Sequence, residues 1–134
     1  AEGGHWPRHA LHLAHNTLVS NFAGLARFVE IWPDRLGSSP DVQVINNLAV
    51  GPGWLGPGLP GRHDGNWPAL AVWFADAHAM DWRLPPGSVL RGAGVDPRQE
   101  PGPDLRPRAE FTWPLGTRAL DADPVRWTPG AFQR

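Results

Sequence analysis

The stretch that decides the predicted fold is residues 7–32, PRHALHLAHNTLVSNFAGLARFVEIW. The following positions recur in it at alternating steps of four and three residues: Leu11, His15, Leu18, Phe22, Leu25, Val29 and Trp32. On a helix, with about 100° per residue, this spacing keeps the side chains within one narrow stripe. Pro7 suits a first helical turn, and Trp32-Pro33 ends the segment because the residue before a proline is pushed out of the α region. We therefore predict a long amphipathic helix over residues 7–32.

The apolar arc of this helix is broader than one stripe. Leu13, Phe28 and Ile31 extend it to one side, and Gly24 lies within it. A broad arc indicates contact with more than one element, so we predict that the helix packs both on its own domain and on a partner. The binding residues expected from the stripe, together with one Trp from the Gly- and Pro-rich loop 51–61, are Leu11, Leu18, Phe22, Leu25, Val29 and Trp54.

The remainder, residues 38–134, has the pattern of a β-rich and loop-rich segment. Residues 42–50, VQVINNLAV, predict a strand with imperfect alternation, and short strands are expected at 88–91, 108–113 and 125–128. Residues 66–82, NWPALAVWFADAHAMDW, fit a second short helix or a buried strand, and their alanines favour the helix. No internal repeat is evident. The predicted fold is α+β: a long N-terminal helix packed on a small antiparallel sheet, a second short helix, and extended Pro/Gly-rich loops.

Length and composition indicate one folded domain over residues 1–134. The chain has 16 Gly and 16 Pro, but eight Trp, five Phe and 41% hydrophobic residues favour a folded core over low-complexity disorder. The formal net charge is -1 and neither sign is concentrated, which argues against nucleic acid as a partner. Cys is absent, which excludes disulfides and thiolate metal sites. No run approaches the ~20 apolar residues of a membrane-spanning helix, so we expect no transmembrane segment.

Histidines are concentrated near the start of the chain. On the predicted helix His9, His12 and His15 step by about 60° each, so their rings diverge across the surface. A divalent metal needs three or four donors that converge on one point. We therefore expect no metal site and no cofactor, and we expect His15 to be a buried, hydrogen-bonded or titratable residue.

A second polar group lies between residues 63 and 81. Imidazoles and carboxylates there have the chemistry of acid–base catalysis or of a metal site, and the candidate catalytic residues are His63, Asp64, Asp76, His78 and Asp81. On a helix His78 and Asp81 are neighbours, whereas on a strand Asp76 and His78 share a face. Capping and salt-bridging are the commoner roles of such pairs.

Three functions are compatible with these features. We favour a non-enzymatic structural, assembly or adhesion subunit of an extracytoplasmic complex, which binds a protein partner or a second copy through the helix. In architecture alone, this order of elements resembles the headpiece of type IV pilin-like proteins, whose apolar N-terminal segment and cysteine pair this sequence lacks. The alternatives are a small enzyme with its site near His63 and His78, and a carbohydrate-binding module that uses exposed Trp such as Trp54, Trp67 or Trp82.

The first residue bears on the expected location of the protein. The sequence begins with Ala1 and not with Met, as it would after removal of a signal peptide or after engineering of the N-terminus. We therefore expect an extracytoplasmic or secreted protein.

Overall fold

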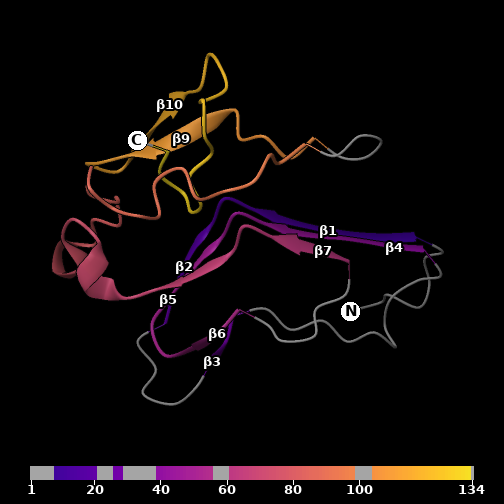
Figure 1. Cartoon of the computed structure of the whole chain (residues 1–134), viewed down its shortest axis with the longest axis horizontal. Helices are drawn as coiled ribbons and strands as arrows, with labels where there is room; N and C mark the ends of the chain where they lie inside the picture. The colour runs from indigo at the N-terminus through magenta and orange to yellow at the C-terminus, as the bar shows by residue number, and fades with distance from the viewer. Residues whose placement is uncertain (1–7, 21–25, 29–38, 56–60, 99–103, 134) are drawn as a thin grey trace.

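Short parallel strands dominate the computed structural model of the chain (Figure 1). The structure describes residues 8–20, 26–28, 39–55, 61–98 and 104–133. The strands in these ranges are β1 Arg8–Ala14, β2 Thr17–Val19, β3 Ala26–Arg27, β4 Ser39–Ile45, β5 Leu48–Val50, β6 Gly53–Trp54, β7 Arg62–Asp64, β8 Trp67–Ala69, β9 Ala109–Thr112 and β10 Gly116–Ala119. Two three-residue 3-10 helices, η3 Ala71–Trp73 and η4 Ala77–Ala79, follow β8.

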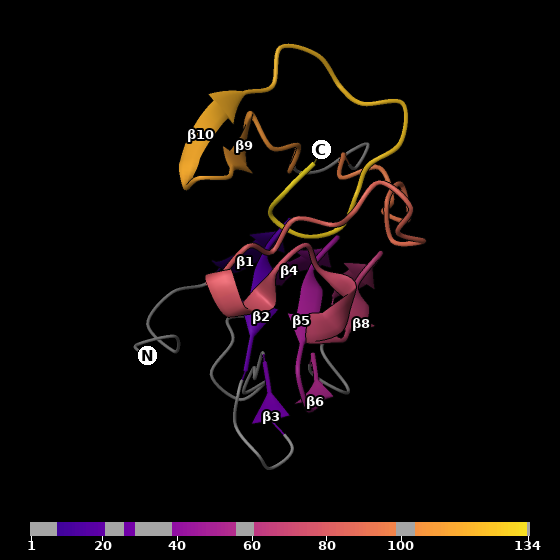
Figure 2. The same ribbon diagram turned by 90° about the vertical axis from the view of Figure 1, so that its left-hand side faces the viewer.

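The first eight strands form three successive coils of a parallel β-solenoid. One sheet has the order β1-β4-β7, a second has the order β2-β5-β8, and a third pairs β3 with β6, all with parallel pairing. Each coil therefore supplies one strand to each of the first two sheets before the chain returns to begin the next coil. Figure 2 shows β2, β5 and β8 side by side, with the two 3-10 helices in front of them.

A two-residue turn joins the first two strands of every coil, and its sequence explains the bend. The first turn residue is His15, Asn46 or Gly65, with φ of 56°, 56° and 66° respectively. Left-handed backbone of this kind is easiest for Gly and Asn, and His is also enriched there. The second turn residue is Asn in all three coils, at positions 16, 47 and 66.

The asparagines stack on one another through their side chains. Asn47 Oδ1 accepts hydrogen bonds from Asn16 N at 2.9 Å and from Asn16 Nδ2 at 3.1 Å. Asn66 Oδ1 accepts in the same way from Asn47 N and Nδ2, both at 2.9 Å. Each of the three side-chain amides also donates to a strand carbonyl, as Asn66 Nδ2 does to Val44 O at 2.7 Å. Because every rung joins two coils, this ladder fixes the register of the solenoid.

The predicted N-terminal helix is wrong. Where the structure describes residues 7–32, it places them in β1, β2 and β3, and no helix of the described residues exceeds three residues. The left-handed turn at His15 followed by Asn16 interrupts a helix, and Thr17 and Val19 favour extended backbone. The α+β class and the pilin-like architecture fall with that helix.

The second predicted helix, over residues 66–82, is also wrong. The segment contains β8, η3 and η4, and Met80 has a φ of 62°. Asp76 Oδ1 accepts from the backbone N of Ala79 at 3.3 Å, and Asp76 pairs with Asp81 in an isolated antiparallel bridge. These local hydrogen bonds stabilise a non-helical backbone, and their effect outweighs the helix propensity of the alanines.

The predicted strands had mixed outcomes. The strand at 108–113 is confirmed by β9, whereas 88–91 forms turns and 125–128 forms no strand. The single strand predicted at 42–50 is extended as expected, but the left-handed turn at Asn46 divides it into β4 and β5, which belong to different sheets. Among the described sheets only the β9–β10 hairpin is antiparallel. The large sheets are parallel, so β4 is covered on both sides, which explains its weak alternation.

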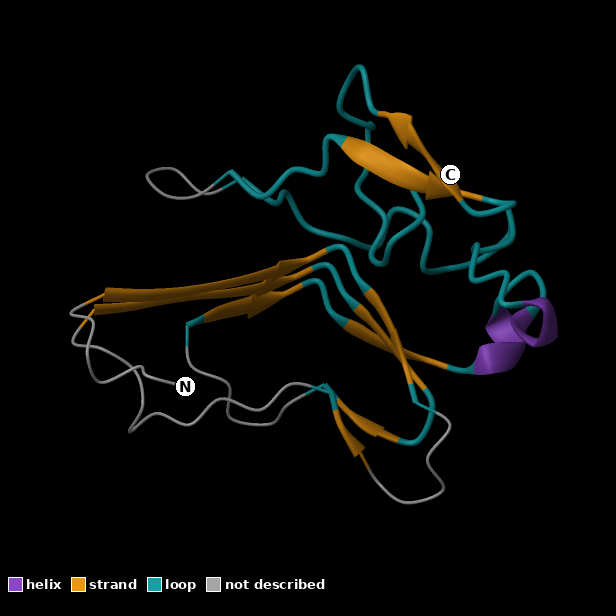
Figure 3. Cartoon of the chain, turned by 180° about the vertical axis from the view of Figure 1, so that it is seen from behind, coloured by secondary structure: helices purple, strands orange, loops and turns teal. Residues whose placement is uncertain are grey.

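The core consists of two clusters, one under each main sheet. Val42 and Val44 pack with Leu13 and Leu55 inside the coil. The larger cluster lies under the second sheet and contains Leu48, Val50, Ala69, Phe74, Leu84 and Leu90, with Trp82 against it. Residues 90–98 and 104–133 return over the outer side of β1, β4 and β7, as Figure 3 shows from behind. In the described part of the chain, no helix is long and apolar enough to cross a membrane.

Candidate functional site

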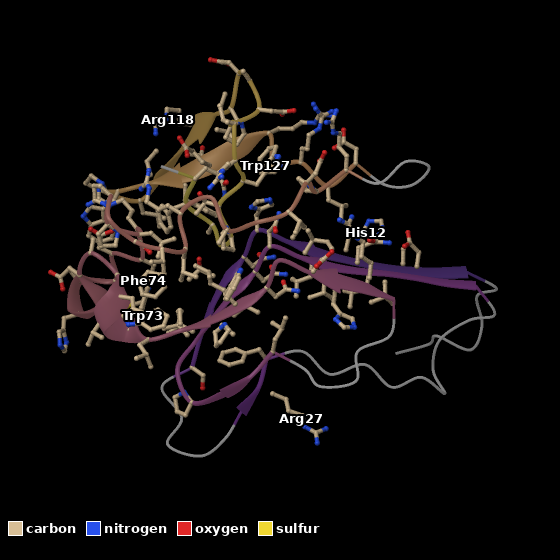
Figure 4. All side chains as sticks on the ribbon, viewed as in Figure 1. His12, Arg27, Trp73, Phe74, Arg118 and Trp127 are labelled. Carbon is tan, nitrogen blue, oxygen red and sulfur yellow. The ribbon has the colours of Figure 1, made fainter. Side chains whose placement is uncertain are left out.

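A row of polar side chains crosses the outer face of the β1-β4-β7 sheet. The parallel register pairs His12 with Gln43 and Gln43 with Arg62, so one residue from each strand lies in line. Asp41 lies two residues before Gln43 and therefore on the same face of β4. Neighbouring strands are about 4.8 Å apart, so these groups can contact one ligand together. Figure 4 shows His12 on the side of the sheet that faces the returning chain.

Asp41 joins the first two members of this row. His12 Nε2 donates to Asp41 Oδ2 at 2.8 Å, and Gln43 Nε2 donates to Asp41 Oδ1 at 3.0 Å. The donor groups of both side chains are thereby turned toward one carboxylate. The orientation of the Gln43 amide follows from this contact, because its oxygen would be repelled by Asp41 if the amide were reversed.

The remaining atom of the Gln43 amide has no partner. Gln43 is only 6% exposed, and its Oε1 is buried without a hydrogen bond. A buried acceptor left unpaired costs about 1–3 kcal/mol, and such atoms are rare in folded proteins. Gln43 Oε1 is therefore an unpaired acceptor next to an imidazole–carboxylate pair.

Residues 93–98, which we call the cover segment, lie along this site. Arg62 Nη2 donates to the carbonyl of Asp96 at 3.1 Å, and Trp67 Nε1 donates to that of Ala93 at 3.3 Å. Val95 is held by both ends of one amide: Asn46 Nδ2 donates to Val95 O at 2.7 Å, and Val95 N donates to Asn46 Oδ1 at 2.8 Å. The first and second sheets and the turn between them thus all hold the cover segment.

His15 occupies the same turn position in the first coil as Asn46 does in the second. It is 7% exposed, and its ring lies 5.4 Å from the ring of Trp127. His15 Nδ1 donates to Thr128 O at 3.1 Å, and Nε2 accepts from Asn46 Nδ2 at 3.2 Å. Burial lowers the pKa of His15 to about 4, although the hydrogen bonds to Thr128 and Gly130 act in the opposite direction. The ring is therefore neutral at pH 7.

The five candidate catalytic residues do not form a joint site. His63 and Asp64 are exposed neighbours on β7 and point to opposite faces, with Asp64 on the face of the polar row and His63 in register with the core residue Val44. Asp76 caps η4, and His78 is exposed on that helix.

Asp81 is occupied by an ion pair. Arg83 Nε and Nη2 donate to its two oxygens at 2.8 and 2.6 Å. The hydrogen bond from Arg83 holds the pKa of Asp81 below its ordinary value against the opposing effect of burial. A structural role therefore accounts for Asp81.

The predicted binding residues no longer share a stripe, because the helix that would align them is absent. Leu11 is 37% exposed on β1, and Leu18 is half-buried on β2. Phe22, Leu25, Val29 and the side chain of Trp54 lie outside the described residues. A different set of large apolar side chains is exposed on residues 70–89: Leu70, Val72, Trp73, Met80 and Val89.

We call this set the apolar surface. A groove of about 370 Å³ is lined in part by Val72, Trp73 and Val89. Of the three Trp proposed as sugar platforms, Trp67 is 45% exposed, whereas Trp82 packs on Phe74 with ring centroids 5.3 Å apart. In the described ranges, no group of three His, Asp or Glu side chains could hold a metal ion.

Sequence reasoning missed His12, Asp41, Gln43 and Arg62 because the wrong secondary structure separated them. The available signal was the motif in which a left-handed residue precedes Asn: His15-Asn16, Asn46-Asn47 and Gly65-Asn66. Aligning the three motifs puts His12, Gln43 and Arg62 at the same offset before the asparagine. Comparisons of the chain with protein-family models, with curated proteins and with solved structures gave no significant match.

Proposed function

We propose that this chain binds a hydroxyl-rich ligand of the carbohydrate class on the outer face of the β1-β4-β7 sheet. The observation that carries the proposal is the buried, unpaired Gln43 Oε1 beside the His12–Asp41 pair. A hydroxyl group donates and accepts at once, so one sugar ring can donate to Gln43 Oε1 and accept from Arg62. An aligned row on rigid strands suits a ligand that extends across the strands.

The binding experiment uses the intact chain and a panel of neutral and uronic oligosaccharides in isothermal titration calorimetry. Gln43→Leu keeps the approximate volume but removes the acceptor, so we expect affinity for the bound sugar to fall at least about tenfold. The substitution also removes the hydrogen bond from Gln43 Nε2 to Asp41, but it eliminates a buried unpaired acceptor, so stability should not fall by more than about 1 kcal/mol. No saturable binding of any sugar by the folded wild-type chain would overturn the proposal.

His12 offers a matched pair of variants. His12→Asn removes the ring that contacts Asp41, whereas His78→Asn removes an exposed histidine on η4. We expect the first to weaken sugar binding and the second to leave it unchanged. Equal effects of the two substitutions would contradict the assignment of the site to the β1-β4-β7 face.

A second candidate function is assembly with a protein partner through the apolar surface. Val72 is 84% exposed and Val89 is 89% exposed, and clustered exposure of this kind is typical of interaction sites. This retains the partner role expected from the sequence but moves it from the absent helix to residues 70–89. Sedimentation of the wild-type chain and of Val72→Ser over a concentration series tests it, since only the wild type should self-associate. The extracytoplasmic location expected from the sequence remains a prediction.

A further inference from the structure

Asn46 connects His15 to the cover segment through a chain of fixed donors and acceptors. The Asn46 amide nitrogen has two protons, of which one goes to Val95 O and the other to His15 Nε2. Its oxygen accepts from Val95 N. Every hydrogen-bonding group of the Asn46 side chain that faces these neighbours is therefore in use, and its orientation is set by both.

The histidine ring is equally constrained on its other side. Thr128 O can only accept, so Nδ1 carries the proton of the neutral ring and Nε2 carries a lone pair. The amide nitrogen of Gln133 lies 3.0 Å from Nδ1 and donates to the carbonyls of Thr128 and Gly130 at 2.9 and 3.1 Å. The C-terminal residues thus hold the ring in place.

A second proton on His15 cannot be accommodated in this arrangement. Nε2–H would point at the Asn46 amide nitrogen, which is also a donor. Reversing the Asn46 amide would satisfy His15, but it would then direct NH₂ at Val95 N–H and oxygen at Val95 O. The mismatch is therefore moved to Val95 and not removed, so the two hydrogen bonds between Asn46 and Val95 must break.

Among the residues that the structure describes, no charged side chain contacts the His15 ring. The groups in contact with the ring belong to Asn46, Trp127, Thr128, Gly130 and Gln133, and all are neutral. The elements around the ring also carry the charged residues Asp64, Asp96 and Arg126, and within the described chain none of these forms a hydrogen bond or ion pair with it.

We propose that His15 is a proton-operated latch, which holds residues 93–98 beside the polar row at Arg62 when neutral and releases them when protonated. The expected consequence, easier access of a ligand to Gln43 at acidic pH, rests on the proposed function. The latch itself concerns only the protein and is testable without ligand. Gly94 marks how closely the segment is held, because a Cβ there would lie 2.9 Å from Asn46 Oδ1.

Amide hydrogen exchange of the intact chain tests the latch directly. The reporters are Val95 N–H, bonded to Asn46 Oδ1, and Gly94 N–H, bonded to Trp127 O. With a pKa of about 4 when latched and an ordinary value of 6.5 when released, the protection factors should fall about 20-fold from about pH 7 to about pH 5. Constant protection factors over this range would overturn the proposal.

His15→Asn supplies a latch that cannot titrate, since Asn also adopts the left-handed turn conformation. We expect protection of Val95 in this variant to be independent of pH over the same range, whereas His78→Asn keeps the wild-type dependence. A variant whose Val95 protection still falls about 20-fold would exclude His15 as the switch.

Sugar binding is then measured separately at both pH values. Latch behaviour without any sugar binding would contradict only the proposed function, and sugar binding with constant protection would contradict only the latch.

Discussion

The side-chain oxygen of Asn47 accepts two hydrogen bonds from Asn16, one from its backbone and one from its amide, so a single atom joins the first coil to the second. Asn47 is fully buried, and its own amide donates to Leu13 O and to Asn66 Oδ1. One side chain therefore contacts all three coils.

Replacement of Asn47 by Ala should destabilise the protein severely. The change leaves buried donors and acceptors on all three coils unpaired, at about 1–3 kcal/mol for each group. We expect a loss of at least about 3 kcal/mol in the free energy of unfolding, measured by urea denaturation. A loss below about 1 kcal/mol would show that the ladder does not hold the coils together.

The stability of the folded chain should depend on His15 between pH 4 and 6.5. The unfolded chain binds a proton near the ordinary pKa of 6.5 and the folded chain only near 4, so the unfolded state holds more protons within this window. Stability is therefore complete above about pH 6.5 and falls with pH, by about 3 kcal/mol at pH 4. Urea unfolding of the wild type and of His15→Asn checks this, because the variant should lack this contribution.

The larger core cluster predicts a strong effect of truncating Leu48. This side chain is 1% exposed and packs in the cluster of Val50, Phe74 and Leu84. We expect Leu48→Ala to cost about 2–5 kcal/mol, whereas Leu115→Ala, at a side chain that is 79% exposed, should cost less than about 0.5 kcal/mol. Thermal unfolding of both variants provides the comparison, and similar melting temperatures would contradict the described core.

The hairpin β9–β10 carries a buried carboxylate whose charge needs its partner. Arg118 donates through Nε and Nη2 to Glu110 Oε1 at 3.0 and 2.6 Å, and the Glu110 side chain is 1% exposed. Arg118→Met keeps the apolar stem but removes the guanidinium, and we expect it to destabilise the chain by about 2–4 kcal/mol. Glu110→Gln in the Arg118→Met background should recover part of this loss, as measured by urea denaturation. No recovery in the double variant would mean that the charge is not the cause.

Sequence reasoning identified the strands but not their arrangement. Residues 42–50 and 108–113 have strand composition that the structure confirms, because β-branched residues dominate the first and the second lies in a local hairpin. The N-terminal segment satisfies both periods: Leu11 and Leu13 alternate as in a strand, while Leu11, Leu18 and Leu25 repeat as on a helix. Periodicity alone could not choose between them, and the choice lay in the turn chemistry of His15-Asn16.

The polar row could not be predicted from the sequence for a related reason. His12, Gln43 and Arg62 come together only through parallel pairing of strands distant in sequence, which depends on register. By contrast, the expectation of a buried or titratable His15 is confirmed by its burial and its lowered pKa, although the ring lies in a turn and not on a helix.

The rungs of the asparagine ladder are separated by 31 residues and then by 19 residues. The side-chain amides of the asparagines align the coils. They do not fix the number of residues between one ladder asparagine and the next. Insertions and deletions of a dozen residues can therefore accumulate in the excursions while the scaffold survives. The unequal spacing leaves no constant period in this sequence, and what recurs is a pair of residues at each bend.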